Sequence, residues 1–357
     1  ALRCIGGQMQ GRLILDTPEK VARAAKMGIA DPNRVYQVND MARGDVVFVR
    51  TPDGTVIARI AIDETGDDAP NVTRALLMYL LAQVRERGPR RIDLEFPSNQ
   101  SVVREIAFGL GFSGTASSHS MMKLADGRVW TPQQWGTYQA ELTRSAALRL
   151  PEAPPPYRNA EQQIPVFTPD GNRVHVTLSL LETLLAPVIF CLKGRPAVIT
   201  PIQRSYAEPL LGHSPQGSLL PDLSASLFAD KHFVCTSRAL KHFKQGTIIL
   251  FYESSKRNGR SALVAMARVR SAHLREMEML SSDDLERSVL TQKNVSDIGV
   301  DALKTIVVFD SVLALKQQIP LKVLEQLGCG RPTDLLTTRP ISDDQLQEIL
   351  IRAFPSE

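Results

Sequence analysis

The sequence predicts a chain that is α/β in its first half and α+β in its second: a partial mixed sheet with helices, followed by a β-barrel with flanking helices. Three observations lead to this fold class. Strand-like and helix-like periods alternate over residues 55–112, a proline-rich segment fills residues 150–165, and β-rich runs dominate residues 231–320. Alternation indicates a sheet covered by helices, and the β-rich runs indicate that the second half is built largely of strands.

The first half contains two strand–helix pairs. Residues 55–63 are a β-rich run, and residues 72–87 place apolar side chains on one helical face. Residues 91–97 alternate apolar and charged positions, as a strand with one buried face does. A second helix is expected from a capping serine, Ser98, to Gly111, a residue type that ends helices in the left-handed conformation.

The second half follows an extended linker. Residues 150–165 are rich in proline and have no apolar period, which predicts a stiff connection. Beyond it, "GTIILFYES" and "SALVAMARVRSA" predict a hairpin that turns at Asn258-Gly259. The run "KTIVVFDSVLALKQQIPLKVLEQLG" predicts a strand and then a proline-led helix. Ser342 and Gln345 have the spacing of a capping box at the start of the last helix.

Composition indicates a cytoplasmic chain that does not enter a membrane. Of its 357 residues, 43% are hydrophobic and 22% charged, which is ordinary for globular proteins. The longest apolar run is too short to span a bilayer, and no signal peptide opens the chain. The cysteines have no paired spacing and suit reduced thiols, and the histidines form no metal-binding pattern. The four cysteines are Cys4, Cys191, Cys235 and Cys329.

Charge is distributed unevenly along the second half. The net charge is only +4, but residues 231–275 contain ten basic residues and one acid, Glu253. Residues 276–304 contain seven acids and three bases. The first segment would attract a polyanion. The alternative is that the two segments face one another or lie on opposite solvated faces.

The strand–helix–strand–helix order ending in Gly111-Phe112 resembles the second half of the GNAT acetyltransferase family, over roughly residues 55–124. This resemblance implies acetyl-CoA as a cofactor, with its pyrophosphate on the loop before the first helix. The loop departs from the family because Asp67 and Asp68 stand where phosphates would lie, and Ala107 stands where the family has its general acid. We therefore expect a degenerate module and name no catalytic residue. The cofactor-binding candidates are Gly66, Asn71, Thr73 and Gln100.

Residues 1–49 resemble a different family, class II fructose-1,6-bisphosphatase, near its C-terminal portion. The metal-binding carboxylates of that family lie upstream of the matching segment, so no bisphosphatase activity is expected. The resemblance implies a fusion or chimera. We expect a helix after Thr17, and expect the segment to replace the first strands of the GNAT-like sheet through a hairpin at Asp53-Gly54. The expected domains are residues 1–49, residues 50–149 and residues 166–357, with residues 150–165 as the linker.

Residues 175–354, with "FKQGTIILFYES", "ALVAMARV" and "QIPLKVLEQLG", resemble the PUA-like superfamily, particularly its ASCH and EVE branches. The resemblance implies a small β-barrel that binds RNA or a modified nucleobase. Such barrels often follow a PIN nuclease domain, which is not recognised in this sequence. The nucleic-acid-binding candidates are Arg204, Tyr206, Lys244, Phe251, Tyr252, Lys256, Arg257, Arg260 and Arg268, with His213 beside them.

The spacing of some candidates along a strand predicts which face of the sheet they occupy. Phe251 and Tyr252 are adjacent on a strand and point to opposite sides, so one of them is expected in the core. Arg268 and Arg270 are two apart and are expected to share a face. We expect RNA binding by this region with the GNAT-like part as scaffold. The alternatives are an acetyltransferase that acts on RNA, a nucleotide or another translation-related acceptor, and an inactive fusion that only folds.

Overall fold

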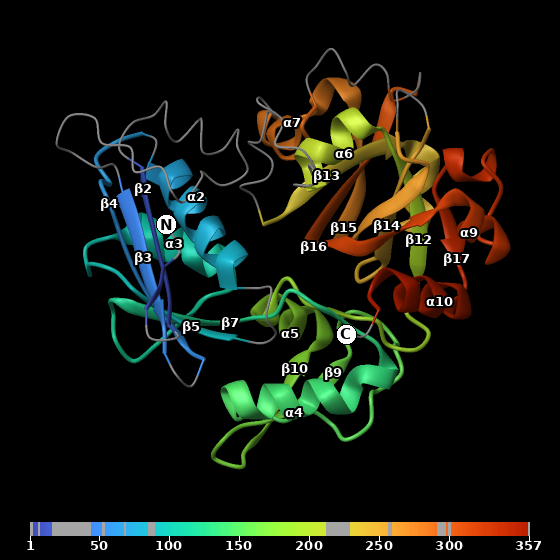
Figure 1. The fold of residues 1–357 in the computed structure, drawn as a ribbon. Helices are drawn as coiled ribbons and strands as arrows, with labels where there is room; N and C mark the ends of the chain where they lie inside the picture. Colours follow the sequence, from blue (N-terminus) through green and yellow to red (C-terminus); the bar gives the residue numbers. More distant parts are fainter. Residues whose placement is uncertain are drawn as a thin grey trace.

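The structure, a computed structural model, describes residues 3–5, 8–15, 44–51, 54–67, 69–84, 90–211, 229–255, 259–290, 298 and 301–355. A sheet near the N-terminus, a middle unit and a second sheet are arranged around a common junction (Figure 1). The helix expected after Thr17 lies outside the described residues. No described helix has the length and apolar character that would let it cross a membrane.

The first sheet is antiparallel except for one parallel pair, β4 with β5. β3, which lies in the segment that resembles the bisphosphatase family, pairs directly with β4, so the hairpin expected around Gly54 is present, and β2 pairs with β3. Its strands, in spatial order, are β1 (Arg3–Ile5), β2 (Gln8–Leu15), β3 (Gly44–Arg50), β4 (Val56–Ile62), β5 (Arg90–Glu95), β7 (Ser120–Ala125) and β6 (Ser113–Gly114).

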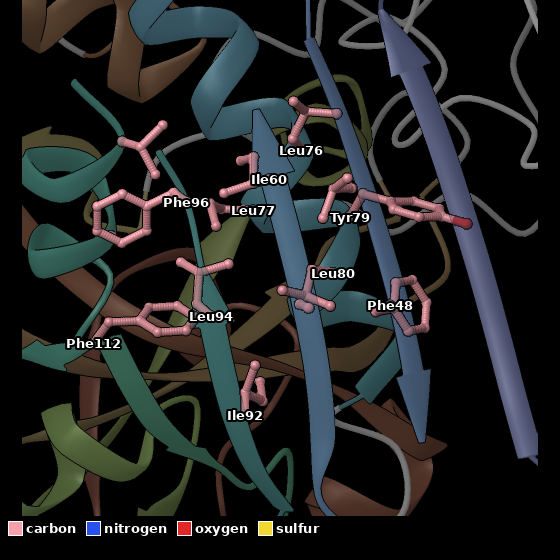
Figure 2. Close-up of a cluster of buried hydrophobic side chains, with 14 of the residues drawn as sticks. Phe48, Ile60, Leu76, Leu77, Tyr79, Leu80, Ile92, Leu94, Phe96 and Phe112 are labelled. Atoms are coloured by element: carbon pink, nitrogen blue, oxygen red, sulfur yellow. The ribbon is translucent and has the colours of Figure 1, made fainter. Parts of the chain in front are cut away.

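Two helices cover one face of this sheet, α2 (Ala69–Val84) and α3 (Ser101–Gly109). Leu76, Leu77 and Leu80 are fully buried because α2 contacts both the sheet and α3. Figure 2 shows Phe48 from β3 beside Tyr79 from α2, with ring centroids 6.2 Å apart. Strands on both sides of residue 50 therefore share one hydrophobic core.

Local helix signals are confirmed in part. Gly111 ends α3 with φ of +83°, and a Cβ there would lie 2.7 Å from the carbonyl oxygen of Thr183. The expected start at Ser98 is wrong: α3 begins at Ser101, because the carboxylate of Glu64 accepts the main-chain N–H groups of Ser101 (3.3 Å) and Val102 (2.8 Å).

The proline-rich segment is anchored in the middle unit at both ends. Leu150, Ala160 and Ile164 are buried, residues 151–159 between them are exposed or half-buried, and residues 163–167 form a strand. Trp130, Tyr138 and Phe190 form an aromatic cluster at its centre. Its elements are β8 (Val129–Trp130), η2 (Pro132–Gln134), α4 (Trp135–Ala146), β9 (Gln163–Phe167), β10 (Arg173–Thr177), α5 (Leu178–Leu185) and β11 (Ile189–Phe190).

The second sheet contains the predicted hairpin as β14 and β15. The predicted strand before the proline-led helix is β16, and Pro320 precedes α9. The strands in spatial order are β13 (Lys231–Thr236), β16 (Leu303–Pro320), β15 (Ala262–Glu276), β14 (Ile248–Glu253), β12 (Ala197–Ile202) and β17 (Arg339–Ile341).

Helices flank both faces of this sheet. The capping box of Ser342 and Gln345 is confirmed at α10. The helical elements are α6 (Arg204–Leu211), η4 (Ser237–His242), η5 (Met277–Met279), α7 (Ser282–Ser288), α9 (Leu321–Gln326), η6 (Asp334–Leu336) and α10 (Asp343–Ala353). The expected closed barrel is not found among the described residues, where the strand order begins at β13 and ends at β17 and these two strands do not pair.

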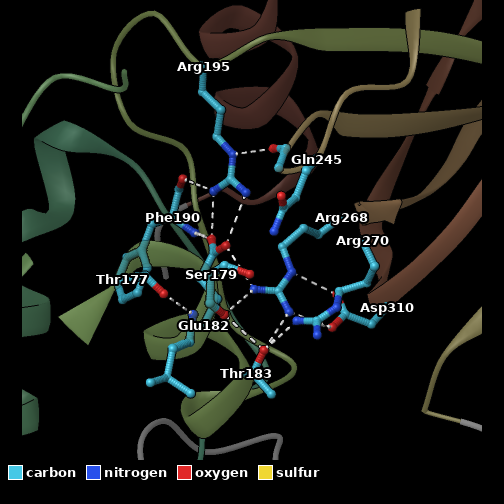
Figure 3. Close-up of polar contacts among 12 residues, drawn as sticks. Thr177, Ser179, Glu182, Thr183, Phe190, Arg195, Gln245, Arg268, Arg270 and Asp310 are labelled. Atoms are coloured by element: carbon cyan, nitrogen blue, oxygen red, sulfur yellow. Dashed lines mark hydrogen bonds and ion pairs between the residues drawn. The ribbon is translucent and has the colours of Figure 1, made fainter. Parts of the chain in front are cut away.

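A buried ion-pair network joins α5 to β15 and β16 (Figure 3). Arg268 donates through Nη1 to Glu182 (3.0 Å) and through Nε to Asp310 (2.7 Å). Arg195 donates through Nη1 to Glu182 (2.6 Å), and the side chains of these two residues and Arg268 are at most 1% exposed. Burial acts to raise the pKa of Glu182, but the charges of Arg195 and Arg268 outweigh it, so the pKa is lowered.

Lys123 reaches the same junction from β7. Its Nζ donates to the carbonyl oxygens of Leu184 (3.1 Å) and Thr183 (3.3 Å) in the last turn of α5. Burial lowers its pKa to about 7; the nearby Asp310 opposes this shift, and the positive charge of Arg268 adds to it. The first sheet, the middle unit and the second sheet thus meet at one set of titratable groups.

Replacing Arg268 with alanine should destabilise the protein by about 3–5 kcal/mol, because Asp310 and Glu182 would lose a buried partner. Arg270→Ala is the matched control: Arg270 contacts Thr183 and Asp310 but is 34% exposed. Urea unfolding monitored by circular dichroism measures both. Equal losses in the two variants would contradict a special role for Arg268.

Lys123 should make stability rise with pH. Its folded pKa of about 7 lies below the unfolded value of about 10.4, so the unfolded chain binds the extra proton between these limits. Stability should therefore increase from about pH 7 upward, by at most about 1.4 kcal/mol per unit, and Lys123→Met should flatten that rise. Unfolding midpoints measured across this range test it. An identical slope in the variant would refute the assignment.

Candidate functional site

A pocket of about 780 Å³ opens beside the second sheet, between the end of β12, α6, β13 and η4. Parallel pairing of β12 with β14 brings Ile202 next to Glu253, so both strands end at the same edge. The residue after β14, Ser254, and the segment 336–338 complete the pocket from that side. The carboxyl ends of parallel strands are where open α/β sheets bind ligands.

Two aromatic rings form part of the wall. Tyr206 comes from α6, whose Ala207, Leu210 and Leu211 are buried against the sheet, and this packing leaves Tyr206 half-buried in the pocket. Phe233 comes from β13 and is also half-buried.

Cationic side chains stand at the rim. Arg238 and Lys241 project from η4 and are exposed. His242 lies beside them, and its pKa is lowered by partial burial and by the charge of Lys241, so it is neutral at pH 7. Asp301 is the acidic residue that lines the pocket among the described residues.

Hydroxyl groups lie at the deep end. Thr200 is fully buried, and its Oγ1 lies 3.4 Å from Oγ1 of Thr338. Ser254 is 7% exposed. Cys235 also lines the pocket, but burial raises the pKa of its thiol to about 12, so it is protonated at neutral pH and is not an activated nucleophile. The pocket therefore offers groups suited to binding a ligand: cationic side chains at the rim, aromatic rings on the wall and hydroxyl groups at the buried end.

Three predicted nucleic-acid-binding residues are buried elsewhere. Phe251 is fully buried against Phe233 and Phe309, which leaves no ring face for a base. Tyr252 is 3% exposed in the core on the opposite face of the sheet. The sequence predicts only one of these two in the core; both are buried because helices cover both faces. Arg268 does share a face with Arg270, but it is 1% exposed and paired.

The remaining candidates differ in position. Tyr206 lines the pocket, and Arg204 on the same helix pairs with Glu208 (2.9 Å). Lys244 is exposed in the turn after η4. Arg260 folds back toward Glu253, with Nη1 3.3 Å from Oε2, instead of extending from a hairpin tip. Lys256, Arg257 and His213 lie outside the described residues.

The expected coenzyme residues have roles within the first sheet unit. The carbonyl oxygen of Gly66 accepts from the N–H of Ala69 (3.0 Å), the first residue of α2. Thr73 is buried and donates back to Ala69 (2.8 Å), and Asn71 accepts from Arg74 (3.3 Å). These contacts stabilise the start of α2.

Gln100 closes a gap in the first sheet. β4 pairs with β5 only from Val56 to Arg59, so Ile62 lies past the last pair. The side-chain amide of Gln100 satisfies both main-chain groups of Ile62, donating to its oxygen (2.5 Å) and accepting from its N–H (3.2 Å). This buried amide thus takes the place of a neighbouring strand.

Sequence reasoning did not single out Arg238, Lys241, Phe233 or Ser254 as site residues. The signal for the two cations was present, because both belong to the basic segment 231–275. Phe233 and Ser254 carry no local signal, since only the pairing of distant strands brings them to one pocket.

Comparisons with known proteins concern two different parts of the chain. Residues 1–83 match the family described as bacterial fructose-1,6-bisphosphatase, glpX-encoded. The D-fructose 1,6-bisphosphatase class 2/sedoheptulose 1,7-bisphosphatase of Synechococcus elongatus is 43% identical over 61 residues, which cover 13% of this chain and 17% of that protein. The corresponding protein of Crocosphaera subtropica is 42% identical over 61 residues, with the same shares. The chain thus matches about a sixth of the length of these relatives.

The family match extends beyond the resemblance expected over residues 1–49, because it continues through β4 and most of α2. Among solved structures, ASCH from Zymomonas mobilis has a TM-score of 0.33 at 10% identity, covering 43% of this chain and 93% of that one. A mutant of the same Zymomonas mobilis protein has a TM-score of 0.33 at 11% identity, covering 44% and 95%. Similarity of this degree transfers no function to the chain.

Proposed function

We propose that the second sheet unit binds single-stranded RNA at the pocket between β12, α6, β13 and η4. One observation carries the proposal: exposed cations and half-buried aromatic rings line the same pocket. Proteins bind single strands by combining a positive surface for the backbone with aromatic rings on which bases stack. The volume, about 780 Å³, lies within the range of pockets that hold small ligands.

The placement of each group supports this function. Arg238 and Lys241 are free to approach phosphates at the rim, where water and neighbouring nucleotides have access. Tyr206 lies further in, where its ring can stack on a base. Buried hydroxyls of Ser254 and Thr200 can donate to or accept from polar atoms of a base. The protonated Cys235 thiol favours a binding role over nucleophilic catalysis.

The double substitution Arg238→Ala and Lys241→Ala should weaken RNA binding and reduce its salt dependence. Two lost phosphate contacts should lower the slope of log K against log salt by about 1.4. Fluorescence anisotropy with a short labelled single-stranded RNA, repeated at several salt concentrations, measures both effects. Arg144→Ala is the control, because it removes an exposed charge from α4. If the slope does not change in the double variant, the rim does not contact phosphates.

Removing the ring of Tyr206 should weaken binding without changing the salt slope. Tyr206→Leu abolishes stacking, which corresponds to a loss of about 5- to 150-fold in affinity. Tyr206→Phe keeps the ring and should bind almost as the original chain does. The same anisotropy titration compares them. A Leu variant that binds as tightly as the Phe variant would exclude stacking on this residue.

A further inference from the structure

The strand β10 has an open edge on the surface of the middle unit. It pairs with β9 in a sheet of two strands, so among the described residues no strand lies along its other edge. Arg173, Val174 and His175 are exposed, and the hydrophobic side chain of Val174 remains 44% accessible. The opposite edge of this small sheet is occupied, because Phe167 on β9 bonds to Arg149.

Hydrogen bonds of β9 fix the direction of the main-chain groups of β10. In an antiparallel pair, each residue directs its N–H and C=O to the same side, and the next residue directs its own to the other. Phe167 uses both of its groups toward Arg149 (2.8 and 3.0 Å). Its neighbour Val166 therefore faces β10, where its partner is Val174. Alternation along β10 then turns the N–H and C=O of His175 toward the open edge.

Two further contacts support this orientation. The partner of His175 on β9 is Pro165, which has no N–H and so suits a pair that exchanges no hydrogen bonds. The N–H of Thr168 donates to the carbonyl oxygen of Asn172 (2.9 Å), which places Asn172 toward β9 and Arg173 toward the open edge. The main-chain groups of Arg173 and His175 have no hydrogen-bond partner in the described part of the chain.

An open edge of this kind is a site for strand addition. Proteins commonly block exposed edges with lysine, proline or a bulge, because free main-chain groups pair with other strands. β10 contains neither proline nor lysine, and its register with β9 has no shift. The chain also turns away from this edge after β10, since the N–H of Leu178 donates to Gln162 on the side of β9 (2.9 Å). A sheet of two strands is marginal, so an added strand would stabilise it.

The sequence of β10 is symmetric around its central histidine. Val174 and Val176 flank His175, so two copies that run antiparallel with His175 at the centre place each Val174 opposite the partner's Val176. His175 then exchanges two hydrogen bonds with its copy, each exposed valine gains an apolar neighbour, and Arg173 meets the uncharged Thr177. We propose that the chain forms a two-fold dimer through β10, which joins two hairpins into one sheet in the order β9–β10–β10–β9.

A second copy fits this edge better than the other occupant of an open strand edge, an extended peptide. A peptide would leave its own outer edge open, whereas two-fold pairing covers the edges of both copies at once. The joined sheet then has no open outer strand of its own, since β9 already bonds to Arg149. The inference is independent of RNA binding, because β10 lies outside the pocket between β12, α6, β13 and η4.

Proline at position 175 tests the pairing, because it removes the N–H at the open edge and leaves the bonds to β9 intact. Sedimentation velocity over a hundredfold range of protein concentration measures the dissociation constant of the dimer. This constant should rise about 30-fold in His175→Pro, since two symmetric hydrogen bonds are lost and each contributes about fivefold. A chain that stays monomeric throughout the range overturns the proposal.

Two control variants separate the edge from the side chain and from folding. His175→Ala removes the imidazole and keeps the N–H, so it should dimerise nearly as the original chain does. Val176→Pro removes an N–H that faces β9, so it should lower the melting temperature, whereas His175→Pro should not. A folded His175→Pro variant that dimerises as tightly as His175→Ala overturns the proposal.

A disulfide across the symmetry axis tests the register. The Cα atoms of a hydrogen-bonded antiparallel pair lie about 5.5 Å apart, within the range that a disulfide spans. His175→Cys should therefore form a covalent dimer under mild oxidation, and non-reducing electrophoresis measures its yield. Lys322→Cys is the control, since Lys322 is exposed on α9 of the second sheet unit. Equal cross-linking of the two variants would overturn the proposed register.

Amide exchange in the original chain provides a measurement that needs no substitution. As the protein concentration rises, the N–H of His175 should exchange more slowly with solvent, whereas the N–H of Val176, already directed to β9, should change little. Dimerisation without any change at His175 would overturn the β10 interface. If the chain instead stays monomeric and an added extended peptide slows exchange of the same amide, the occupant is a peptide and the dimer is refuted.

Discussion

The whole arrangement depends on pairing the guanidinium of Arg268, which lies between α5 and the second sheet with almost no contact with water. A charge in that position is tolerable only with acidic partners, and Glu182 and Asp310 supply them from different elements. Glu182 is shared with Arg195. The relative position of α5, β15 and β16 is therefore constrained by hydrogen-bond geometry as well as by hydrophobic contact, which would allow sliding.

Ion pairs separate some basic residues of segment 231–275 from those that stay exposed. Arg268 is neutralised in the interior, Arg275 pairs with Asp284, and Arg260 lies against Glu253. Their charges contribute little to the field in front of the pocket. Arg238 and Lys241 are exposed at its rim. Because fields are screened within about 8–10 Å by physiological salt, these two positions matter for an approaching polyanion far more than the summed charge of the segment does.

Sequence reasoning succeeded where the determinants are local. The β14–β15 hairpin, the proline-led α9 and the capping box of α10 each follow from residues a few positions apart. It failed where contacts between distant segments determine the structure. Whether β13 meets β17 depends on the curvature of six strands, which no short pattern encodes. The burial of both Phe251 and Tyr252 had a signal, since "IILFYE" is a continuous apolar run typical of a strand covered on both faces. No local sequence pattern indicated that Arg268 would be buried and paired with Glu182 and Asp310.

The first sheet shows how the segment that matches a bisphosphatase family is built into this chain. Strands join a sheet through main-chain hydrogen bonds, which do not depend on side-chain identity, so β2 and β3 can extend any sheet with a compatible edge. Side chains set the register: Phe48 must face Tyr79, since a slip of one residue would turn it to the other face. A fragment can therefore be kept for its strands alone. The family match then coincides with strands and a helix that build the first sheet unit.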